Sequence, residues 1–105
     1  MEVENKEVHA MLKKTYLEKQ GVCVVTFNVK FEKASKVEIV GEWNNWIPEA
    51  MKIKKDGSFW ITKRLKKGRE YRFKYLIDGH IWENDPQADR YVPNPYGSTD
   101  SVVVC

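Results

Sequence analysis

Glu70-Tyr71-Arg72-Phe73-Lys74-Tyr75-Leu76-Ile77-Asp78-Gly79 carries the strongest structural signal in this chain. Aromatic or aliphatic side chains occupy every second position, and Arg72 and Lys74 stand between them. A period of two predicts a β-strand with one buried face, and Asp78-Gly79 predicts a tight turn after it. The residues expected to face the core are Tyr71, Phe73, Tyr75 and Ile77.

The same alternation recurs on both sides of this segment. In residues 22–31 the predicted buried face consists of Cys23, Val25, Phe27, Val29 and Phe31. Further strands are expected at residues 36–41, 51–54, 58–65, 80–83 and 101–104. About seven or eight short strands with almost no helix favour an all-β fold, an immunoglobulin-like β-sandwich of two antiparallel sheets.

Turn residues predict how the strands are connected. Asp56-Gly57 predicts a hairpin closed by a type I′ turn. Gly68 predicts another hairpin, between residues 58–65 and the strand that begins at Glu70. The pairs that this hairpin would bring together are Thr62 with Lys74 and Trp60 with Leu76.

The chain is expected to form one folded domain. Its 105 residues are enough for a single hydrophobic core and too few for two. Residues 1–20 are charged and their apolar positions have no regular spacing, so we expect an N-terminal arm or short helix there. Residues 21–105 are expected to form the β-sandwich, with a loop rich in proline and asparagine at residues 84–99.

Composition and charge restrict the function classes. The chain is 42% apolar with a formal net charge of +3, and its short lysine pairs are typical of solvated surface. No apolar run approaches the roughly 20 residues of a membrane span. The acidic start, with Glu2, Glu4 and Glu7, has no signal-peptide layout. We therefore expect a cytoplasmic protein without a nucleic-acid or membrane partner.

Cys23 and Cys105 are the two cysteines of the chain. Both lie in apolar strand-like segments, where an unpaired cysteine behaves as a small hydrophobic residue. If their strands pair in parallel, the two residues lie too far apart for a disulfide bond, whereas antiparallel pairing could bring them together. We expect free thiols.

The segment Gly41-Glu42-Trp43-Asn44-Asn45-Trp46 places two tryptophans at the end of a strand and in a turn. Asn44-Asn45 and Pro48 end the preceding alternation, because asparagine suits turn geometry and proline lacks a donor for the sheet. Trp43 can pack inward, but Trp46 has no evident core position. An exposed indole predicts a flat ligand that stacks on it.

Several pieces between residues 22 and 104 form an ordered series. They are Val37-Glu38-Ile39-Val40-Gly41-Glu42-Trp43-Asn44-Asn45-Trp46, Gly68, Tyr71-Arg72-Phe73-Lys74-Tyr75-Leu76-Ile77-Asp78-Gly79, Trp82, Asp85-Pro86 and Tyr96-Gly97-Ser98-Thr99-Asp100-Ser101-Val102. In this order they resemble carbohydrate-binding module family 48, an early-set immunoglobulin-like family. It includes the glycogen-binding domain of AMP-activated protein kinase β subunits and the N-terminal domains of isoamylases and branching enzymes.

The resemblance implies non-catalytic binding of an α-1,4-glucan such as glycogen, starch or a malto-oligosaccharide. The binding residues that it implies are Trp46, Lys74, Trp82, Tyr96, Ser98 and Asp100. In the family, two tryptophans stack on sugar rings and a sheet lysine donates hydrogen bonds to sugar hydroxyls. A terminal loop inserts an apolar side chain and offers polar groups. Such a set suits pyranose rings, which have apolar C–H faces and hydroxyl edges.

Three positions depart from the family pattern. Trp43 stands where the family usually has phenylalanine. Ile81 is one extra residue in the turn before Trp82 and would re-aim that ring. Asp100 replaces a common asparagine, which removes two amide donors from the terminal loop and adds a charge.

Each candidate residue also has an ordinary structural interpretation. Trp46 could pack on the Pro48 loop, and Tyr96 could cap the sandwich. Without the resemblance, Lys74 would be interpreted as solvated surface. Trp60 faces outward where the family has no sugar contact, so we expect the N-terminal arm or a second chain to cover it.

A second hypothesis is a protein-interaction module that keeps this fold but has weak or no sugar affinity. Its contact would be the N-terminal arm or the Trp60 face. Ile81 and Asp100 favour this hypothesis, whereas the intact tryptophans and Lys74 favour sugar binding. Binding of single-stranded nucleic acid is disfavoured, because Asn, Glu and Asp rather than Lys and Arg flank Trp46 and Trp82.

The sequence carries no catalytic or cofactor signature. A glycosidase needs two carboxylates across a deep cleft, whereas Glu83, Asp85 and Asp89 lie where a turn is predicted. His9 and His80 have no cysteine or carboxylate at metal-ligand spacing. We therefore expect no enzyme activity, no metal and no cofactor.

Overall fold

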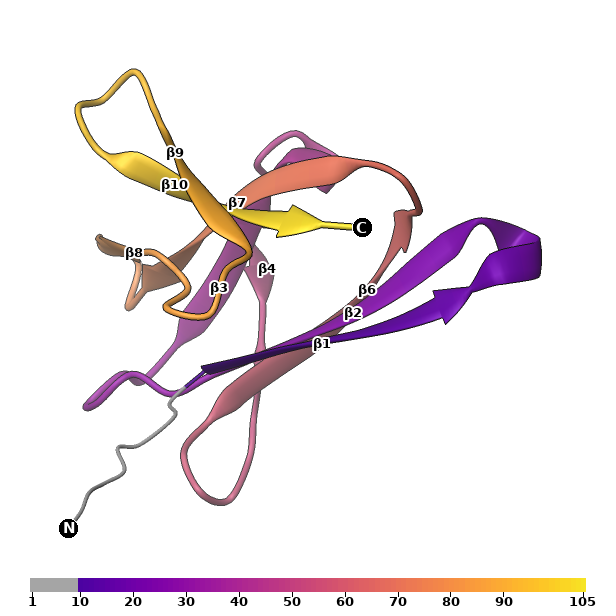
Figure 1. The fold of residues 1–105 in the computed structure, drawn as a ribbon. Coiled ribbons are helices and arrows are strands. Elements are labelled where there is room, and N and C mark those ends of the chain that lie inside the picture. Colours follow the sequence, from indigo (N-terminus) through magenta and orange to yellow (C-terminus); the bar gives the residue numbers. More distant parts are fainter. Residues whose placement is uncertain (1–9) are drawn as a thin grey trace, which may run out of the picture.

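The computed structural model describes residues 10–105, which form two antiparallel β-sheets packed face to face (Figure 1). The first sheet contains, in order, β1 (Ala10–Leu17), β2 (Val22–Val29), β6 (Phe59–Lys66) and β5 (Lys52–Ile53). The second contains β4 (Glu49–Ala50), β3 (Val37–Gly41), β7 (Glu70–Ile77), β10 (Thr99–Val104) and β9 (Arg90–Pro93), and β8 (Ile81–Glu83) also pairs with β7. The predicted all-β sandwich is confirmed; the additional strands are β1 and the short edge strands β4 and β9.

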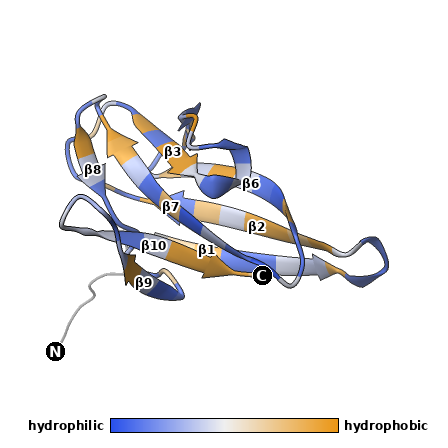
Figure 2. Ribbon diagram, turned by 90° about the horizontal axis from the view of Figure 1, so that it is seen from above, coloured by the Kyte–Doolittle hydropathy of each residue, from blue (hydrophilic) through white to orange (hydrophobic). Residues whose placement is uncertain are grey.

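The core lies between the two sheets and follows the predicted alternation. Every second side chain of β2 and β7 is buried, and Figure 2 shows apolar and polar residues alternating along these strands. The rings of Phe27 and Phe73 meet edge to face with their centroids 5.0 Å apart. Aromatic contacts therefore join the two sheets at the centre of the sandwich.

The connection at Gly68 is not a hairpin, so the pairing predicted there was wrong. β6 pairs with β2 along its whole length in the first sheet, and β7 pairs with β3 and β10 in the second. Residues 67–69 therefore cross from one sheet to the other. The inward face of β7 is apolar throughout and that of β6 is apolar except for Lys63, and placing the strands in separate sheets buries both faces in the core.

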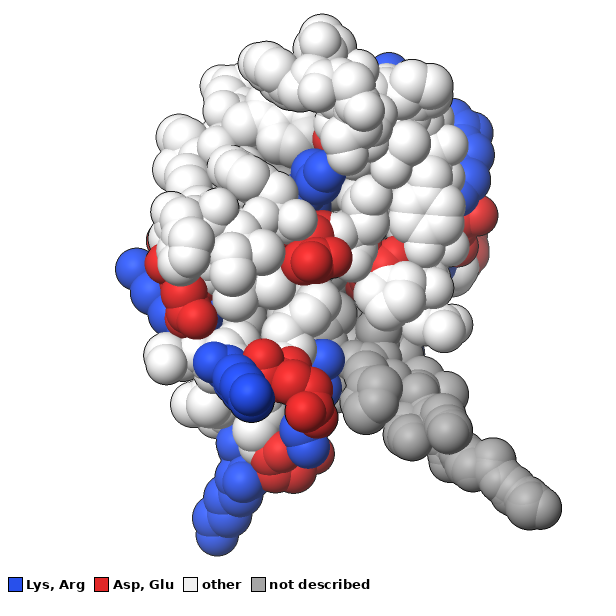
Figure 3. Space-filling view, turned by 90° about the vertical axis from the view of Figure 1, so that its left-hand side faces the viewer, with Lys and Arg blue, Asp and Glu red and all other residues white. Residues whose placement is uncertain are grey.

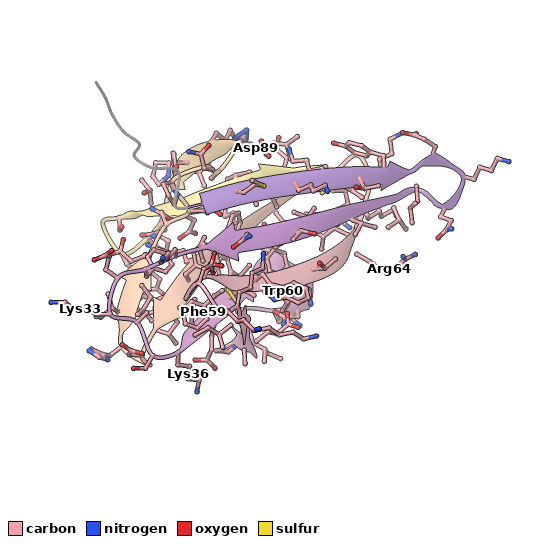
Figure 4. All side chains as sticks on the ribbon, turned by 90° about the horizontal axis from the view of Figure 1, so that it is seen from below. Lys33, Lys36, Phe59, Trp60, Arg64 and Asp89 are labelled. Carbon is pink, nitrogen blue, oxygen red and sulfur yellow. The ribbon has the colours of Figure 1, made fainter. Side chains whose placement is uncertain are left out.

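This crossing separates residues that the predicted hairpin would have joined. Thr62 lies beside Thr26, and Trp60 lies beside Asn28 and Lys52. In Figure 4, which views the molecule from below, Trp60 lies along β6 in the sheet that also contains β1 and β2. Its face of the sandwich is opposite to the face that carries Lys74.

Strand β1 lies in the segment for which the sequence predicted an arm or short helix, so that prediction was wrong for Ala10–Leu17. The pattern was hard to recognise because the inward positions, paired with the buried face of β2, hold Lys14 and Tyr16 besides Leu12. Lys14 Nζ donates to Asp89 Oδ2 at 2.7 Å, and Figure 4 shows Asp89 beside β1. Glu18–Gln20, at the end of the predicted arm or short helix, form a short 3-10 helix, and residues 1–9 with His9 lie outside the described residues.

The two Asp-Gly turns have different geometries. At Asp56-Gly57 only Gly57 has a positive φ, of 88°, so this turn is not the expected type I′ turn. Gly57 N donates to Lys54 O at 3.0 Å, which closes a turn over residues 54–57 whose last residue, Gly57, has the left-handed conformation. Asp78 and Gly79 have φ values of 51° and 78°, both positive as a type I′ turn requires.

The two cysteines are free, as expected. Cys23 lies in β2 and Cys105 directly follows β10, so they belong to opposite sheets and neither pairing considered from the sequence occurs. The two thiols meet at the core. Burial, together with a hydrogen bond to Cys23, raises the pKa of the Cys105 thiol to about 12.

Candidate functional site

Lys74 lies in the middle of the outer face of the second sheet. It stands between the buried Phe73 and Tyr75, so its side chain points away from the core. Its ammonium Nζ donates to Thr99 O at 2.8 Å, which holds the side chain over the start of β10. Because a lysine ammonium carries three N–H donors, Lys74 can still donate to a ligand.

Trp82 lies on β8 beside Leu76, on the same face as Lys74, and is 51% exposed. The extra residue Ile81 pairs with Ile77, so it occupies the alternate side of the short strand. The insertion therefore leaves the Trp82 indole on the outer face of the second sheet.

Trp46 lies in the loop that follows β3 and is 39% exposed. Its backbone N donates to Gly41 O at 2.9 Å, and the loop residues Asn45 and Trp46 have positive φ values of 62° and 64°. Asn44 closes the loop, because its Oδ1 accepts a hydrogen bond from Ile47 N at 3.1 Å. This loop geometry leaves the large apolar side chain of Trp46 partly exposed at the surface.

The loop that carries Trp46 and the strand that carries Trp82 lie on opposite sides of Lys74 along β7. Val40 of β3 pairs with Lys74, and the Trp46 loop begins just beyond the next residue, Gly41. Trp82 pairs with Leu76, two residues beyond Lys74 in the opposite direction. The pairing thus places Lys74 and Trp82 on one sheet face, with the Trp46 loop at the other end of the same stretch of β7.

The loop between β9 and β10 carries Tyr96 and Ser98, and Asp100 follows it in β10. Tyr96 is 90% exposed, so it does not cap the sandwich, and Ser98 is exposed as well. Asn94 shapes the loop, because its Oδ1 accepts hydrogen bonds from Tyr96 N and Ser98 N at 2.9 and 3.2 Å. Asp100 is buried; it accepts from Asn94 Nδ2 at 3.0 Å and lies 4.0 Å from Arg72. Its carboxylate is therefore engaged within the protein.

The remaining tryptophans lie elsewhere. Trp43 packs against the core with its ring centroid 5.5 Å from that of Phe27, in agreement with the inward orientation predicted for it. Trp60 lies on the outer face of the first sheet, with Lys52 Nζ 5.1 Å from its ring centroid. The structure thus places Trp60 on a different sheet from Lys74 and Trp82.

A buried carboxylate lies beneath the candidate site. Asp85 is fully buried and accepts a 2.7 Å hydrogen bond from Tyr75 Oη and a 2.8 Å bond from Gln87 N. Burial raises the pKa of Asp85, although these two hydrogen bonds favour its charged form. Burial and the adjacent Asp85 raise the pKa of Tyr75 well above its usual value.

Hydrogen bonds connect Asp85 to Thr99 of β10, the residue whose carbonyl oxygen accepts from Lys74. Asp85 N donates to Ser101 Oγ at 2.8 Å, and that hydroxyl donates to Asn84 Oδ1 at 2.9 Å. Asn84 Nδ2 in turn donates to Thr99 Oγ1 at 2.9 Å. Sequence reasoning missed Asn84 and Thr99, because only the folded chain brings them together.

The side of the molecule on which β8 and β9 lie in Figure 1 is shown in Figure 3. Its upper part is formed mostly by uncharged side chains, whereas acidic and basic side chains gather below. Among residues 10–105, no three His, Cys, Asp or Glu side chains form a group that could hold a metal ion. Within the same residues, no helix is long and apolar enough to cross a membrane.

Residues 23–103 match a family model described as the glycogen recognition site of AMP-activated protein kinase. The chain belongs to this family. The part that matches the glycogen-recognition family includes all six residues predicted for the site. A comparison with curated proteins gave no match.

The fold is similar to part of a solved bacterial enzyme structure. The crystal structure of ferric enterobactin esterase from Salmonella typhimurium matches with a TM-score of 0.69 and 11% sequence identity. The match covers 93% of this chain but only 34% of the esterase chain. At that identity the likeness shows the fold of this glycogen-recognition family member and nothing of its activity.

Proposed function

We propose that this protein binds α-1,4-glucan, as glycogen, a starch-like polymer or a malto-oligosaccharide. Trp46 and Trp82 stack on sugar rings, and Lys74 donates hydrogen bonds to sugar hydroxyls. The observation that supports this most directly is that Lys74 and the exposed Trp82 share one sheet face, with the loop of the exposed Trp46 on the other side of Lys74 along β7. Membership of the glycogen-recognition family supports the same conclusion.

The chemistry of this face suits a neutral polysaccharide. Indole rings cover the apolar C–H faces of pyranose rings, and hydroxyl groups need hydrogen-bond partners at the edges. The Lys74 ammonium supplies donors, and the exposed Ser98 hydroxyl can donate and accept. Tyr96 supplies an aromatic surface at the tip of the loop.

We propose that binding is weak and non-catalytic. Each stacked ring contributes about 1 kcal/mol beyond its buried area, and ordering the oligosaccharide offsets part of that gain. The dissociation constant for a short oligosaccharide is then on the order of 10 µM to 1 mM. The carboxylates near β8 and β9 do not serve hydrolysis, since Asp85 is buried and bonded to Tyr75. We place the protein in the cytoplasm, without a nucleic-acid or membrane partner.

Calorimetric titration with maltoheptaose and β-cyclodextrin tests the proposal. The wild type should bind both sugars, whereas Trp46→Ala and Trp82→Ala should each weaken binding by about tenfold or more. Trp60→Ala is the matched control, because it removes an indole from the opposite outer face and should leave the affinity unchanged. A folded wild type that binds neither sugar at millimolar concentration would contradict the proposal.

A further inference from the structure

The backbone of the Trp46 loop adopts a conformation that needs support. Asn45 and Trp46 both have φ near +60°, a region that bulky residues rarely adopt. Such conformations persist where surrounding contacts hold them, and they are frequent at binding sites. Asn44 provides the first contacts, because it accepts from Ile47 N at 3.1 Å and donates to Ile47 O at 3.0 Å.

Glu49 anchors this loop from the other side. Its Oε1 accepts hydrogen bonds from Trp43 Nε1 at 3.2 Å and from Asn44 Nδ2 at 3.1 Å. The side chain comes from β4, which pairs with β3 directly below the loop. One carboxylate oxygen therefore joins the tryptophan that packs on the core to the asparagine that shapes the Trp46 turn.

The same carboxylate is fixed by the opposite sheet. Lys63 Nζ lies 2.8 Å from both oxygens of Glu49. The side chains of Glu49 and Lys63 are only 31% and 20% exposed, respectively, so water screens this ion pair less than a surface pair. Glu49 thus ties the Trp46 loop to both layers of the sandwich.

We propose that Glu49 is a positioning residue for glucan binding. It holds Asn44, and through Asn44 the strained turn, in the geometry that presents the Trp46 indole to a sugar ring. The inference rests on the proposed function, because the ligand of Trp46 is the glucan. A loop that is ordered before binding loses less conformational entropy when the sugar stacks, and removing the anchor therefore lowers affinity.

Three variants separate positioning from general stability. Glu49→Ala removes the acceptor and should weaken maltoheptaose binding by about tenfold. Glu49→Gln keeps an oxygen that can accept from Trp43 and Asn44, and it should stay within about threefold of the wild type. Lys63→Met is the matched control, because it removes the intersheet ion pair but leaves the acceptor. It should lower the unfolding temperature without a comparable loss of affinity.

An NMR measurement tests the anchor without sugar. Backbone ¹⁵N relaxation of Trp46 and Ile47 should show a rigid loop in the wild type and a loosened loop in Glu49→Ala, with Glu49→Gln near the wild type. If Glu49→Ala does not fold, Asn44→Ala removes the same connection and should give the same result.

The outcomes are distinguishable. Absence of sugar binding by the wild type would overturn the proposed function, whereas the relaxation data would still decide whether Glu49 orders the loop. Unchanged relaxation and affinity in folded Glu49→Ala would overturn the positioning role. Equal affinity losses in Lys63→Met and Glu49→Ala, with the relaxation of the Trp46 loop unchanged in both, would also overturn it, because they would indicate a general effect of stability.

Discussion

The phenol of Tyr75 donates a 2.7 Å hydrogen bond to Oδ2 of Asp85, and both side chains are buried between the sheets. The bond keeps a carboxyl group in an interior that would otherwise exclude it. The backbone N of Asp85 donates to Ser101 Oγ, which donates to Asn84 Oδ1, so the same residue also belongs to the hydrogen-bond chain that reaches Thr99.

The raised pKa of Asp85 predicts the pH dependence of stability. The folded chain keeps this proton to a higher pH than the unfolded chain, so between the two pKa values the folded state binds more protons. The contribution of Asp85 is therefore most favourable below about pH 4 and declines as the pH rises through the raised folded pKa. Urea unfolding of the wild type and Asp85→Asn at several pH values measures this contribution. The difference between their free energies of unfolding should change between the unfolded and the folded pKa of Asp85, and a constant difference would contradict the prediction.

Gly41 is predicted to be required for the packing of Trp43. A Cβ at this position would lie 2.6 to 2.8 Å from three atoms of the Trp43 ring. The backbone of Gly41 is extended, so the penalty of Gly41→Ala comes from overpacking and should be about 1–3 kcal/mol of unfolding free energy. Adding Trp43→Phe should recover part of this loss in a double-mutant cycle. Simple additivity of the two substitutions would show that the ring contact is not the cause.

Lys74→Met is predicted to weaken sugar binding while preserving the fold. The substitution keeps an unbranched apolar side chain but removes the ammonium, and the loss of a charged donor should reduce affinity about tenfold. Calorimetry with maltoheptaose measures the effect. Lys66→Met, an exposed position on β6, is the control and should behave like the wild type. Equal affinities of the two variants would remove Lys74 from the site.

Cys105 is predicted to react slowly with alkylating reagents. With a thiol pKa of about 12, its thiolate fraction at pH 8 should be smaller than that of an ordinary cysteine. This fraction should be lower by on the order of a thousandfold. The alkylation rate should fall with it, because the thiolate is the reactive form. Mass spectrometry after iodoacetamide treatment should find rapid labelling only once the chain is unfolded in denaturant. Rapid labelling of the folded protein at pH 8 would contradict the pKa.

The sequence allowed the fold to be predicted where side chains alternate without interruption. β2 and β7 have buried faces of large apolar residues, and their inward sides were identified correctly. β1 was missed, because Lys14 occupies an inward position and is neutralised by Asp89, which is 75 residues away in the chain. No local pattern reveals such a partner.

The connection at Gly68 shows a different limit. A glycine between two alternating strands is compatible with a hairpin and with a crossing between sheets, because both leave the side-chain faces unchanged. Whether the chain forms a hairpin or crosses between sheets depends on which other strands pair with each of the two. β6 has β2 and β5 as neighbours, which leaves β7 to pair in the opposite sheet.

The candidate site could be predicted only in part for similar reasons. Trp46, Lys74 and Trp82 were identified by short motifs, and the strand pairing brings Trp82 and the Trp46 loop to either side of Lys74 along β7. Their contacts with Glu49 and Asn84 involve polar residues without a motif of their own, and these contacts form only after folding. The burial of Asp100 and its hydrogen bond from Asn94 likewise could not be predicted from the sequence.

The crossing between β6 and β7 has a practical spectroscopic consequence. It leaves the four indoles in distinct surroundings: Trp43 packed on the core, Trp60 beside Lys52 on one outer face, Trp82 exposed on the other, and Trp46 exposed in the loop after β3. The tryptophan fluorescence of the protein is therefore a sum of components from more buried and more water-exposed indoles. A neutral soluble quencher such as acrylamide should preferentially remove the long-wavelength part from Trp46 and Trp82. The remaining fluorescence, from Trp43 and Trp60, then serves as an internal reference. Changes in the emission of Trp46 and Trp82 can be measured against it in a single sample.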